Sequence, residues 1–144
     1  GFIQYQCFIP AENSASTFRT VLRRCRERGL SAHLGVLKRH RADEFLVSCN
    51  LDGFSLALDF RVSARNRTRL AELVAELDGI VLQAGGRFYF AKDSTLRPEA
   101  VQAFLGPATL AKLVELKRRC DPEGLLQSNL SRRLLPELHM RIID

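Results

Sequence analysis

Hydrophobic and polar residues alternate at the start of the chain, as is typical of a β-strand with one buried face. In residues 2–10, FIQYQCFIP, apolar side chains take the odd positions, and Pro10 closes the strand. The same alternation returns in residues 54–62, FSLALDFRV. The small or polar positions of the two strands are Gln4, Gln6, Ser55, Ala57 and Asp59. Each strand is therefore expected to have one apolar face and one that cannot join a core.

Two segments have the 3.6-residue period of amphipathic helices. The first is expected to begin with Asn13 or Ser14 as its cap and to end at Gly29. The second carries its apolar stripe through residues 70–81 and stops at the glycine pair 85–86. Both helices would pack one stripe against a sheet.

Two further strands complete the pattern, in residues 31–40 (SAHLGVLKRH) and 87–91 (RFYFA). The order βαββαβ predicts an α+β fold of the ferredoxin-like kind, an antiparallel sheet with both helices on one face. The other face is then free to meet a ligand, a second domain or water. Two C-terminal helices are expected at 98–106 and 107–120, followed by a short segment at 125–135 and a tail.

Composition is that of an ordinary globular domain. The chain has 144 residues, 46% hydrophobic and 26% charged, so we expect a single domain over residues 1–144. It starts at Gly1 and enters a strand at once, so we expect a fragment of a longer protein. No apolar run is long enough for a membrane span, and no leader is visible. We therefore expect a cytoplasmic protein, although a targeting signal could lie outside this sequence.

The cysteines, the histidines and the net charge do not point to a particular function. The four cysteines are widely spaced and no histidine stands at zinc-ligand spacing, so we expect no metal site and free buried thiols in a reducing compartment. The net charge is +6, with basic clusters at 23–29, 38–42 and 131–134. Such clusters can follow phosphates, but the arginines of 23–29 fall between the apolar positions of a helix, which favours a solvated face.

The stretch GGRFYFAKDS, residues 85–94, raises the question of a site. A helix stops, an aromatic strand follows, and a Lys-Asp pair ends it. Either this is a core strand that ends in solvated charges, or it brings Tyr89 and Lys92 to a site. Strict alternation puts Tyr89 and Lys92 on opposite faces, so both reach one site only if the strand breaks near Ala91.

Five segments in this order carry a resemblance to a known family. They are FIQYQCFIP, AHLGVLKRH, SLALDF, GGRFYFAKDS and CDPEGLLQSNLSRRL. Together they resemble the C-terminal half of FAD-linked oxidases of the vanillyl-alcohol-oxidase superfamily. The resemblance implies that the chain is the substrate (cap) domain of a larger flavoprotein. An N-terminal FAD-binding domain of the same polypeptide would hold most of the cofactor.

The resemblance also assigns roles to individual residues. It implies that Gln4, Gln6, Lys38 and Ser55 bind the substrate, and that Tyr89 and Lys92 lie beside the flavin ring. Asp59 matches the aspartate of the family's DF pair. Ser55 and Ala57 depart from the family, which has asparagine and cysteine at these positions in some members. Chemistry that depends on that thiol is not expected here, and the sugar substrate is left open.

The family's chemistry explains why these residue types are needed. FAD-dependent oxidation of a CH–OH group leaves negative charge near flavin N1 and the C2 carbonyl, which a fixed lysine such as Lys92 stabilises. The hydroxyl proton must also be accepted, and Tyr89, Lys38 or Asp59 could do so. The sequence does not choose among these three residues.

A second hypothesis is a ferredoxin-like binding module for nucleic acid or a regulatory ligand, which would use the free face and the +6 charge. Nucleic-acid binders of this topology stack bases on exposed aromatic residues of central strands. The free face predicted here offers Gln, Ser, Ala and Asp instead, so we expect a small sugar or alcohol substrate and no nucleic acid. An exposed free face could also pair two copies in a dimer. The electron acceptor and the oligomeric state are left open.

Overall fold

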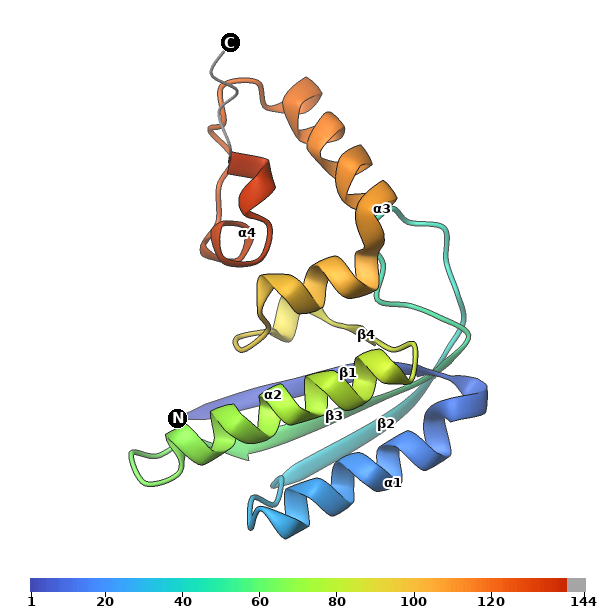
Figure 1. Ribbon diagram of the computed structural model, residues 1–144, viewed down its shortest axis with the longest axis vertical. Coiled ribbons are helices and arrows are strands. Elements are labelled where there is room, and N and C mark those ends of the chain that lie inside the picture. The colour runs from blue at the N-terminus through green and yellow to red at the C-terminus, as the bar shows by residue number, and fades with distance from the viewer. Residues whose placement is uncertain (140–144) are drawn as a thin grey trace. The chain divides into compact units, whose positions relative to one another are not determined.

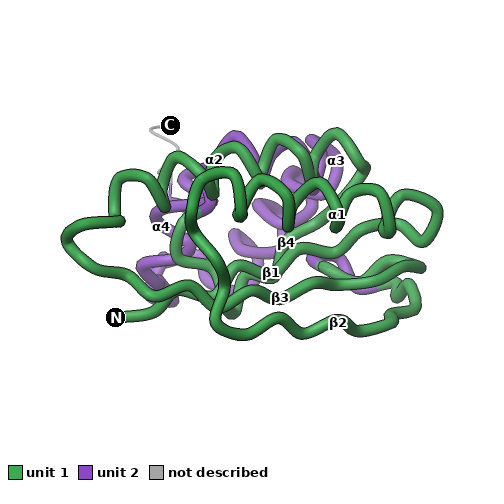
Figure 2. The backbone as a smooth tube through the Cα atoms, turned by 90° about the horizontal axis from the view of Figure 1, so that it is seen from below, with its two compact units in different colours: residues 1–44, 48–95 green, residues 45–47, 96–144 purple. Residues whose placement is uncertain are grey.

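The structure, a computed structural model, describes residues 1–139, which form two compact units (Figure 2). Unit 1 comprises residues 1–44 and 48–95. Unit 2 comprises residues 45–47 and the described residues from Leu96 onward. That residues 1–144 act as one domain stays a prediction. The last part of the predicted tail, residues 140–144, lies outside the described residues.

Unit 1 has the predicted ferredoxin-like α+β fold. Its elements are β1 (Phe2–Pro10), α1 (Ala11–Glu27), β2 (Leu34–His40), β3 (Gly53–Arg61), α2 (Arg67–Gln83) and β4 (Arg87–Phe88). The sheet has the order β2-β3-β1-β4, and every neighbouring pair is antiparallel. Both helices lie on one side of the sheet (Figures 1 and 2). The fold class predicted from the hydrophobic periods is confirmed.

The core of unit 1 lies between the sheet and its two helices. The strands contribute the side chains of their predicted apolar face, and the helices contribute those of their apolar stripes. Buried members of this core are Tyr5, Cys7, Ile9, Leu56, Leu58, Phe60, Phe18, Val21, Leu73, Leu77 and Val81. The sheet face that carries Gln4 and Gln6 is therefore the one not covered by α1 and α2, and we call it the open face.

The helix ends match the predictions better than the helix starts. Gly29 and Gly85 have φ of 63° and 72°, a left-handed conformation that often follows the last turn of a helix and that glycine adopts most easily. Both predicted helix stops are confirmed. The predicted cap of α1 is wrong, because the helix begins at Ala11 directly after Pro10. Ser14 lies within the first turn, where its hydroxyl donates to the Ala11 carbonyl. Strand β2 also begins later than predicted, at Leu34.

The predicted fourth strand over residues 87–91 is mostly wrong. Only Arg87 and Phe88 pair with β1, and a single 3-10 turn, η1 (Phe90–Lys92), follows. Backbone N–H groups of Lys92 and Asp93 donate to the carbonyls of Tyr89 and Phe90, at 3.2 and 3.1 Å. These local bonds turn the chain out of the sheet just where the sequence alternation required a break.

Unit 2 consists of helices. Helix α3 (Pro98–Cys120) is interrupted at Gly106, where φ is 76° and ψ is 161°, so it contains the two predicted helices as two segments (Figure 1). The short helix α4 (Asn129–Leu134) and the 3-10 turn η2 (Pro136–His139) follow. No helix within residues 1–139 is both long and apolar enough to cross a bilayer.

The cysteines only partly match the expectation of buried free thiols. Cys7 and Cys25 are buried, and burial raises the pKa of their thiols to about 12 and about 11. Cys49 is partly buried. Cys120 is exposed at the C-terminal end of α3, so for this residue the expectation is wrong.

Candidate functional site

The open face gathers most of the predicted site residues. Directly paired residues of antiparallel strands share a face, and the register pairs Gln4 with Asp59, Gln6 with Ala57 and Lys38 with Ser55. The remaining members follow from the same register. By register, the open face includes Phe2, Gln4, Gln6 and Phe8 of β1, Ser55, Ala57, Asp59 and Arg61 of β3, and Leu34, Val36, Lys38 and His40 of β2.

Two clusters of polar contacts lie on this face. In the first, Gln4 Nε2 donates to Asp59 Oδ1 at 2.5 Å. In the second, Gln6 Nε2 donates to Ser55 Oγ at 3.3 Å, and His40 Nε2 lies 2.8 Å from the same oxygen. Ser55 is fully buried, whereas Gln4, Gln6 and His40 are half-buried and Lys38 is exposed. The amides, the carboxylate and the imidazole thus form a half-buried polar layer over a buried serine.

The open face is more aromatic than the sequence predicted. Phe8 shares the parity of Gln4 and Gln6, and its ring centroid lies 4.7 Å from that of His40 and 6.4 Å from that of Tyr89. Because these two rings lie against it, Phe8 is only 2% exposed. The expectation that this face carries only small or polar residues is therefore wrong at Phe2, Phe8, Leu34 and Val36.

Tyr89 and Lys92 meet at the β4 edge of the sheet. The 3-10 turn brings Lys92 Nζ to 5.9 Å from the centroid of the Tyr89 ring, within the range of a cation–π contact. Tyr89 in turn lies against Phe8 of the open face. Both side chains are exposed. The break near Ala91 that the shared site required is present, so the two residues do belong to one place.

His40 was missed by the sequence analysis, which treated the histidines only as metal ligands. The strand alternation could have found it, because His40 has the parity of Lys38 in the predicted strand 31–40. Partial burial, with the nearby charges of Lys38 and Arg39, lowers the pKa of His40 below its ordinary value of 6.5. The imidazole is therefore neutral at pH 7 and can both donate and accept a hydrogen bond.

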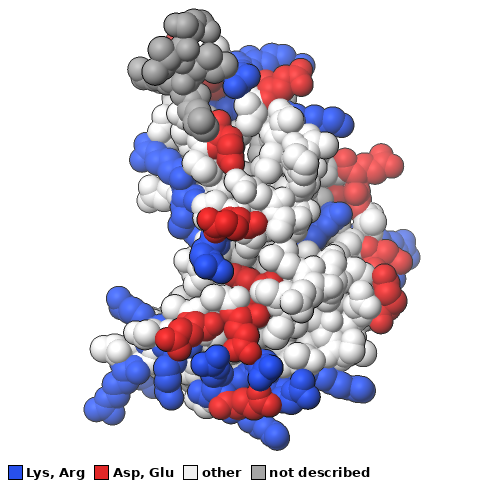
Figure 3. All heavy atoms as spheres, in the orientation of Figure 1, with Lys and Arg blue, Asp and Glu red and all other residues white. Residues whose placement is uncertain are grey.

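The basic cluster at 23–29 belongs to a solvated helix surface, as expected. Arg24 and Arg28 of α1 each reach Glu76 of α2, at 3.1 and 2.9 Å. Figure 3 shows Lys and Arg side chains interleaved with Asp and Glu over the part of unit 1 where these helices lie. In the second cluster, Arg39 pairs with Asp52 and lies 5.3 Å from the Phe54 ring centroid. These arginines are engaged with groups of the chain itself.

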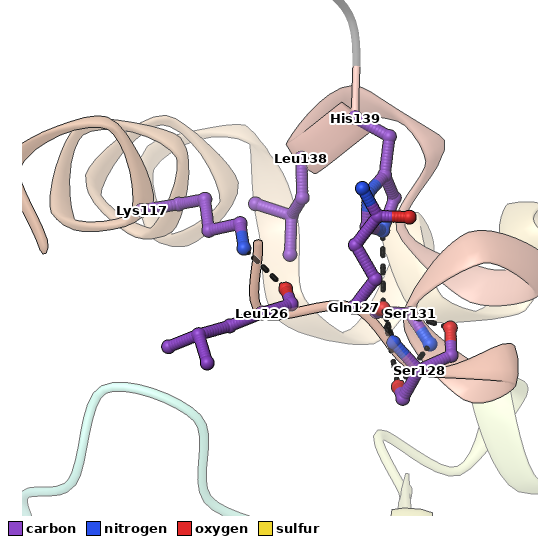
Figure 4. A pocket seen from close by; sticks show the side chains of 7 residues that line it. All are labelled: Lys117, Leu126, Gln127, Ser128, Ser131, Leu138 and His139. Atoms are coloured by element: carbon purple, nitrogen blue, oxygen red, sulfur yellow. Dashed lines mark hydrogen bonds between the residues drawn. The ribbon is translucent and has the colours of Figure 1, made fainter. Parts of the chain in front are cut away.

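Unit 2 has a hollow of about 370 Å³, shown in Figure 4. Its polar side chains already have partners within the chain. Ser128 and Ser131 form the capping box at the start of α4, and His139 Nε2 lies 3.0 Å from Ser131 Oγ. Lys117 contacts Asp121 and the Leu126 carbonyl. The two serines of the hollow are thus used in capping a short helix.

No metal centre is formed by the part of the chain that the structure describes. Residues 1–139 contain no group of three or more His, Cys, Asp or Glu side chains placed to hold a metal ion. The candidate site is built from amide, hydroxyl, imidazole, carboxylate and lysine side chains and from aromatic rings.

Known proteins, including the two that follow, resemble the chain over most of its length. The chain is 32% identical over 135 residues to the decaprenylphosphoryl-beta-D-ribose oxidase of Mycolicibacterium smegmatis, which covers 93% of the chain and 28% of that protein. It is 33% identical over 135 residues to an uncharacterised protein encoded in the mprA 5' region of Streptomyces coelicolor, 35% of whose length it covers. No protein-family model matches the chain. The chain therefore spans about a third or less of the relatives it matches.

Proposed function

Because the chain is homologous to a segment of an FAD-linked oxidase over 93% of its length, we propose that it forms the substrate domain of an FAD-dependent oxidoreductase. The reaction would oxidise a CH–OH group of a sugar or related polyol. The observation that carries this proposal is the composition of the open face, where Gln4, Gln6, Lys38, Ser55 and Asp59 share one side of the sheet whose β4 edge carries Tyr89 and Lys92.

The β4 edge fits the ring of a flavin. Lys92 is an exposed cation beside an exposed aromatic side chain, and neither has its polar group committed to a hydrogen bond within residues 1–139 that would need to break. A flavin ring presents a flat aromatic surface and an electron-rich edge at N1 and the C2 carbonyl. Tyr89 would pack against the ring, and Lys92 would place its charge at that edge.

When bound, FAD would supply the acceptor for the hydride that leaves the alcohol carbon. The chain's own residues would do the rest. Gln4 and Gln6 would orient the hydroxyl groups of the substrate, and Asp59 would fix Gln4 through the contact at 2.5 Å. Tyr89, Lys38 or Asp59 would accept the hydroxyl proton.

The proposed substrate class follows the relative's name and the polar open face. The M. smegmatis protein is named for the oxidation of a ribose carried on a prenyl phosphate. A sugar hydroxyl group offers both a donor and an acceptor, which amide and carboxylate side chains match. Ala57 stands where some members of the family have cysteine, so a reaction or inhibitor that needs that thiol would not act here.

The proposed function requires an FAD-binding domain elsewhere in the same polypeptide. This chain covers 28% of the oxidase it resembles, and we propose that an FAD-binding domain contributes most of the cofactor contacts. The open face and the β4 edge would be the surfaces turned towards that cofactor. A flavin held mainly by another domain would lose most of its contacts to this chain alone.

The open face gives the nucleic-acid alternative little support. Its aromatic residues on the central strand β1 are Phe2, which is exposed at the very start of the strand, and Phe8, which is only 2% exposed and cannot stack on a base without moving. The arginines of 23–29 that reach α2 are engaged with Glu76.

The test is anaerobic mixing of the purified full-length polypeptide with a short-chain prenylphosphoryl-β-D-ribose, followed by flavin absorbance. We expect bound flavin and its reduction by the sugar. Lys38→Met should lower kcat/KM about tenfold, because the loss of one polar contact with the substrate costs about 1.5 kcal/mol. Lys112→Met, at an exposed position of α3, is the matched control. A full-length protein that binds no flavin would refute the proposal.

A further inference from the structure

His40 occupies a position on the open face that the proposed reaction does not use. It is the last residue of β2, and its ring is held on two sides. Nε2 lies 2.8 Å from the hydroxyl of Ser55 on β3, and the ring lies tilted at 56° against Phe8 of β1, with centroids 4.7 Å apart. Residues of three strands therefore meet at one imidazole. These contacts hold the His40 ring more firmly than the side chain of an edge strand is usually held.

The Ser55 hydroxyl determines what His40 can offer. Ser55 Oγ accepts from Gln6 Nε2 at 3.3 Å, and its own hydrogen can be donated to His40 Nε2 at 2.8 Å. In a neutral imidazole, a nitrogen that accepts leaves the other nitrogen as the donor. Nδ1 of His40 has no hydrogen-bond partner among the residues that the structure describes, 1–139. With the Ser55 hydroxyl as the donor to Nε2, Nδ1–H is a spare donor on a half-buried ring.

Gln6 adds an acceptor to the same place. Its Nε2 is engaged by Ser55, while its Oε1 is buried and has no hydrogen-bond partner within residues 1–139. An unpaired buried acceptor destabilises the protein, and a ligand that donates to it would remove that penalty. A donor on His40 and an acceptor on Gln6, tied together through Ser55, match one hydroxyl group, which both accepts and donates.

From this arrangement we propose that His40 is a specificity-determining residue that binds a substrate hydroxyl group together with Gln6, with Ser55 as the buried positioning residue beneath both. The inference rests on the proposed function and extends it, because it assigns the recognition of one hydroxyl to a named trio that spans β1, β2 and β3. Phe8 supports the ring of His40 and takes no part in the hydrogen bonds.

Lys38 and His40 then have different tasks on the same strand. Lys38 is an exposed amine, whereas His40 is half-buried and neutral at pH 7, since burial and the nearby side chains of Lys38 and Arg39 lower its pKa. A neutral donor selects for a hydroxyl group without demanding an anion. The trio therefore discriminates between a sugar and its deoxy analogue, because the analogue leaves buried polar groups without partners.

The test uses the full-length flavoprotein and the short-chain prenylphosphoryl-β-D-ribose as the probe. His40→Phe keeps a ring against Phe8 but removes both nitrogens, so it should raise KM three- to tenfold, as the loss of one neutral hydrogen bond does, with kcat within twofold. His40→Gln restores a donor and should recover part of the lost affinity. His33→Gln, at an exposed position next to β2, is the matched control and should change neither constant.

A second readout does not depend on turnover. With histidine labelled at Cε1 with ¹³C, and the His40 signal assigned from the His40→Gln variant, the probe should shift the His40 signal and leave that of His33 in place. If the probe reduces the flavin but leaves the His40 signal and the KM of His40→Phe unchanged, the inference is overturned and the proposed function stands. If the probe does not reduce the flavin, the proposed function fails, and the inference falls with it.

Discussion

Ser55→Ala is the substitution that tests the open face most simply. Ser55 is fully buried, and its hydroxyl is the only link between Gln6 and His40 that the described residues provide. Alanine fits the same space, so no cavity larger than the missing hydroxyl forms. The change therefore removes two hydrogen bonds and little else.

The expected cost follows from these two bonds. A neutral hydrogen bond contributes about 0.5–1.5 kcal/mol, and the contact to Gln6 is long at 3.3 Å while that to His40 is 2.8 Å. Both partners are half-buried and can turn towards water once released, which places the sum in the lower part of the range. We expect Ser55→Ala to lower the free energy of unfolding by about 1–2 kcal/mol.

Urea denaturation of the chain, followed by far-ultraviolet circular dichroism, measures this change. Ser16→Ala is the control, because Ser16 is exposed on α1 and its hydroxyl only donates to the Asn13 carbonyl within the helix. Its effect should stay within about 0.5 kcal/mol. In a double-mutant cycle with His40→Phe, the coupling energy should be at least about 0.5 kcal/mol. A loss below that value for Ser55→Ala, with no coupling to His40, would refute the proposed network.

Three further predictions concern unit 1 and the thiols. Gly53→Ala should destabilise the chain by about 2 kcal/mol or more in the same urea assay, because the added Cβ would overlap the Ile9 carbonyl oxygen. Folding lowers the pKa of His40, so the unfolded chain takes up a proton at a higher pH than the folded chain does. The free energy of unfolding should therefore fall as the pH drops below about 6.5. His40→Gln should remove that part of the pH dependence. A thiol reagent at neutral pH should label Cys120 rapidly and Cys7 only on unfolding, as mass spectrometry of the labelled peptides would show, because burial raises the pKa of Cys7 to about 12.

The fold could be predicted because its determinants are local. The alternation in β1 and β3 gave each side chain its face, and the helix stripes and stop glycines placed α1 and α2. The order of these elements then left few ways to form a sheet. The same alternation placed Gln4, Gln6, Ser55 and Asp59 together before the register was known, because residues of one parity share a face in any register that buries the apolar side.

The parts that could not be predicted depend on contacts between elements or on local backbone geometry. The sequence of residues 87–91 favours a strand, but β4 pairs with β1 only at Cys7 and Phe8, and the 3-10 turn replaces the rest. That turn is what brings Lys92 to Tyr89. His40 needed the pairing of β2 with β3, which places it against Ser55. The sequence alone did not contain the distance between them.

In the proposed function, Lys92 lies at the electron-rich edge of a flavin. The measurement is anaerobic stopped-flow reduction of the flavin in the full-length protein, together with its midpoint potential. Lys92→Met should slow reduction about tenfold to a hundredfold and make the potential more negative, because one charge-assisted contact worth about 1.5–3 kcal/mol is lost. Lys112→Met, exposed on α3, should behave like the unaltered protein. If Lys92→Met is reduced at the original rate and potential, Lys92 is an ordinary solvated charge and the claim is contradicted.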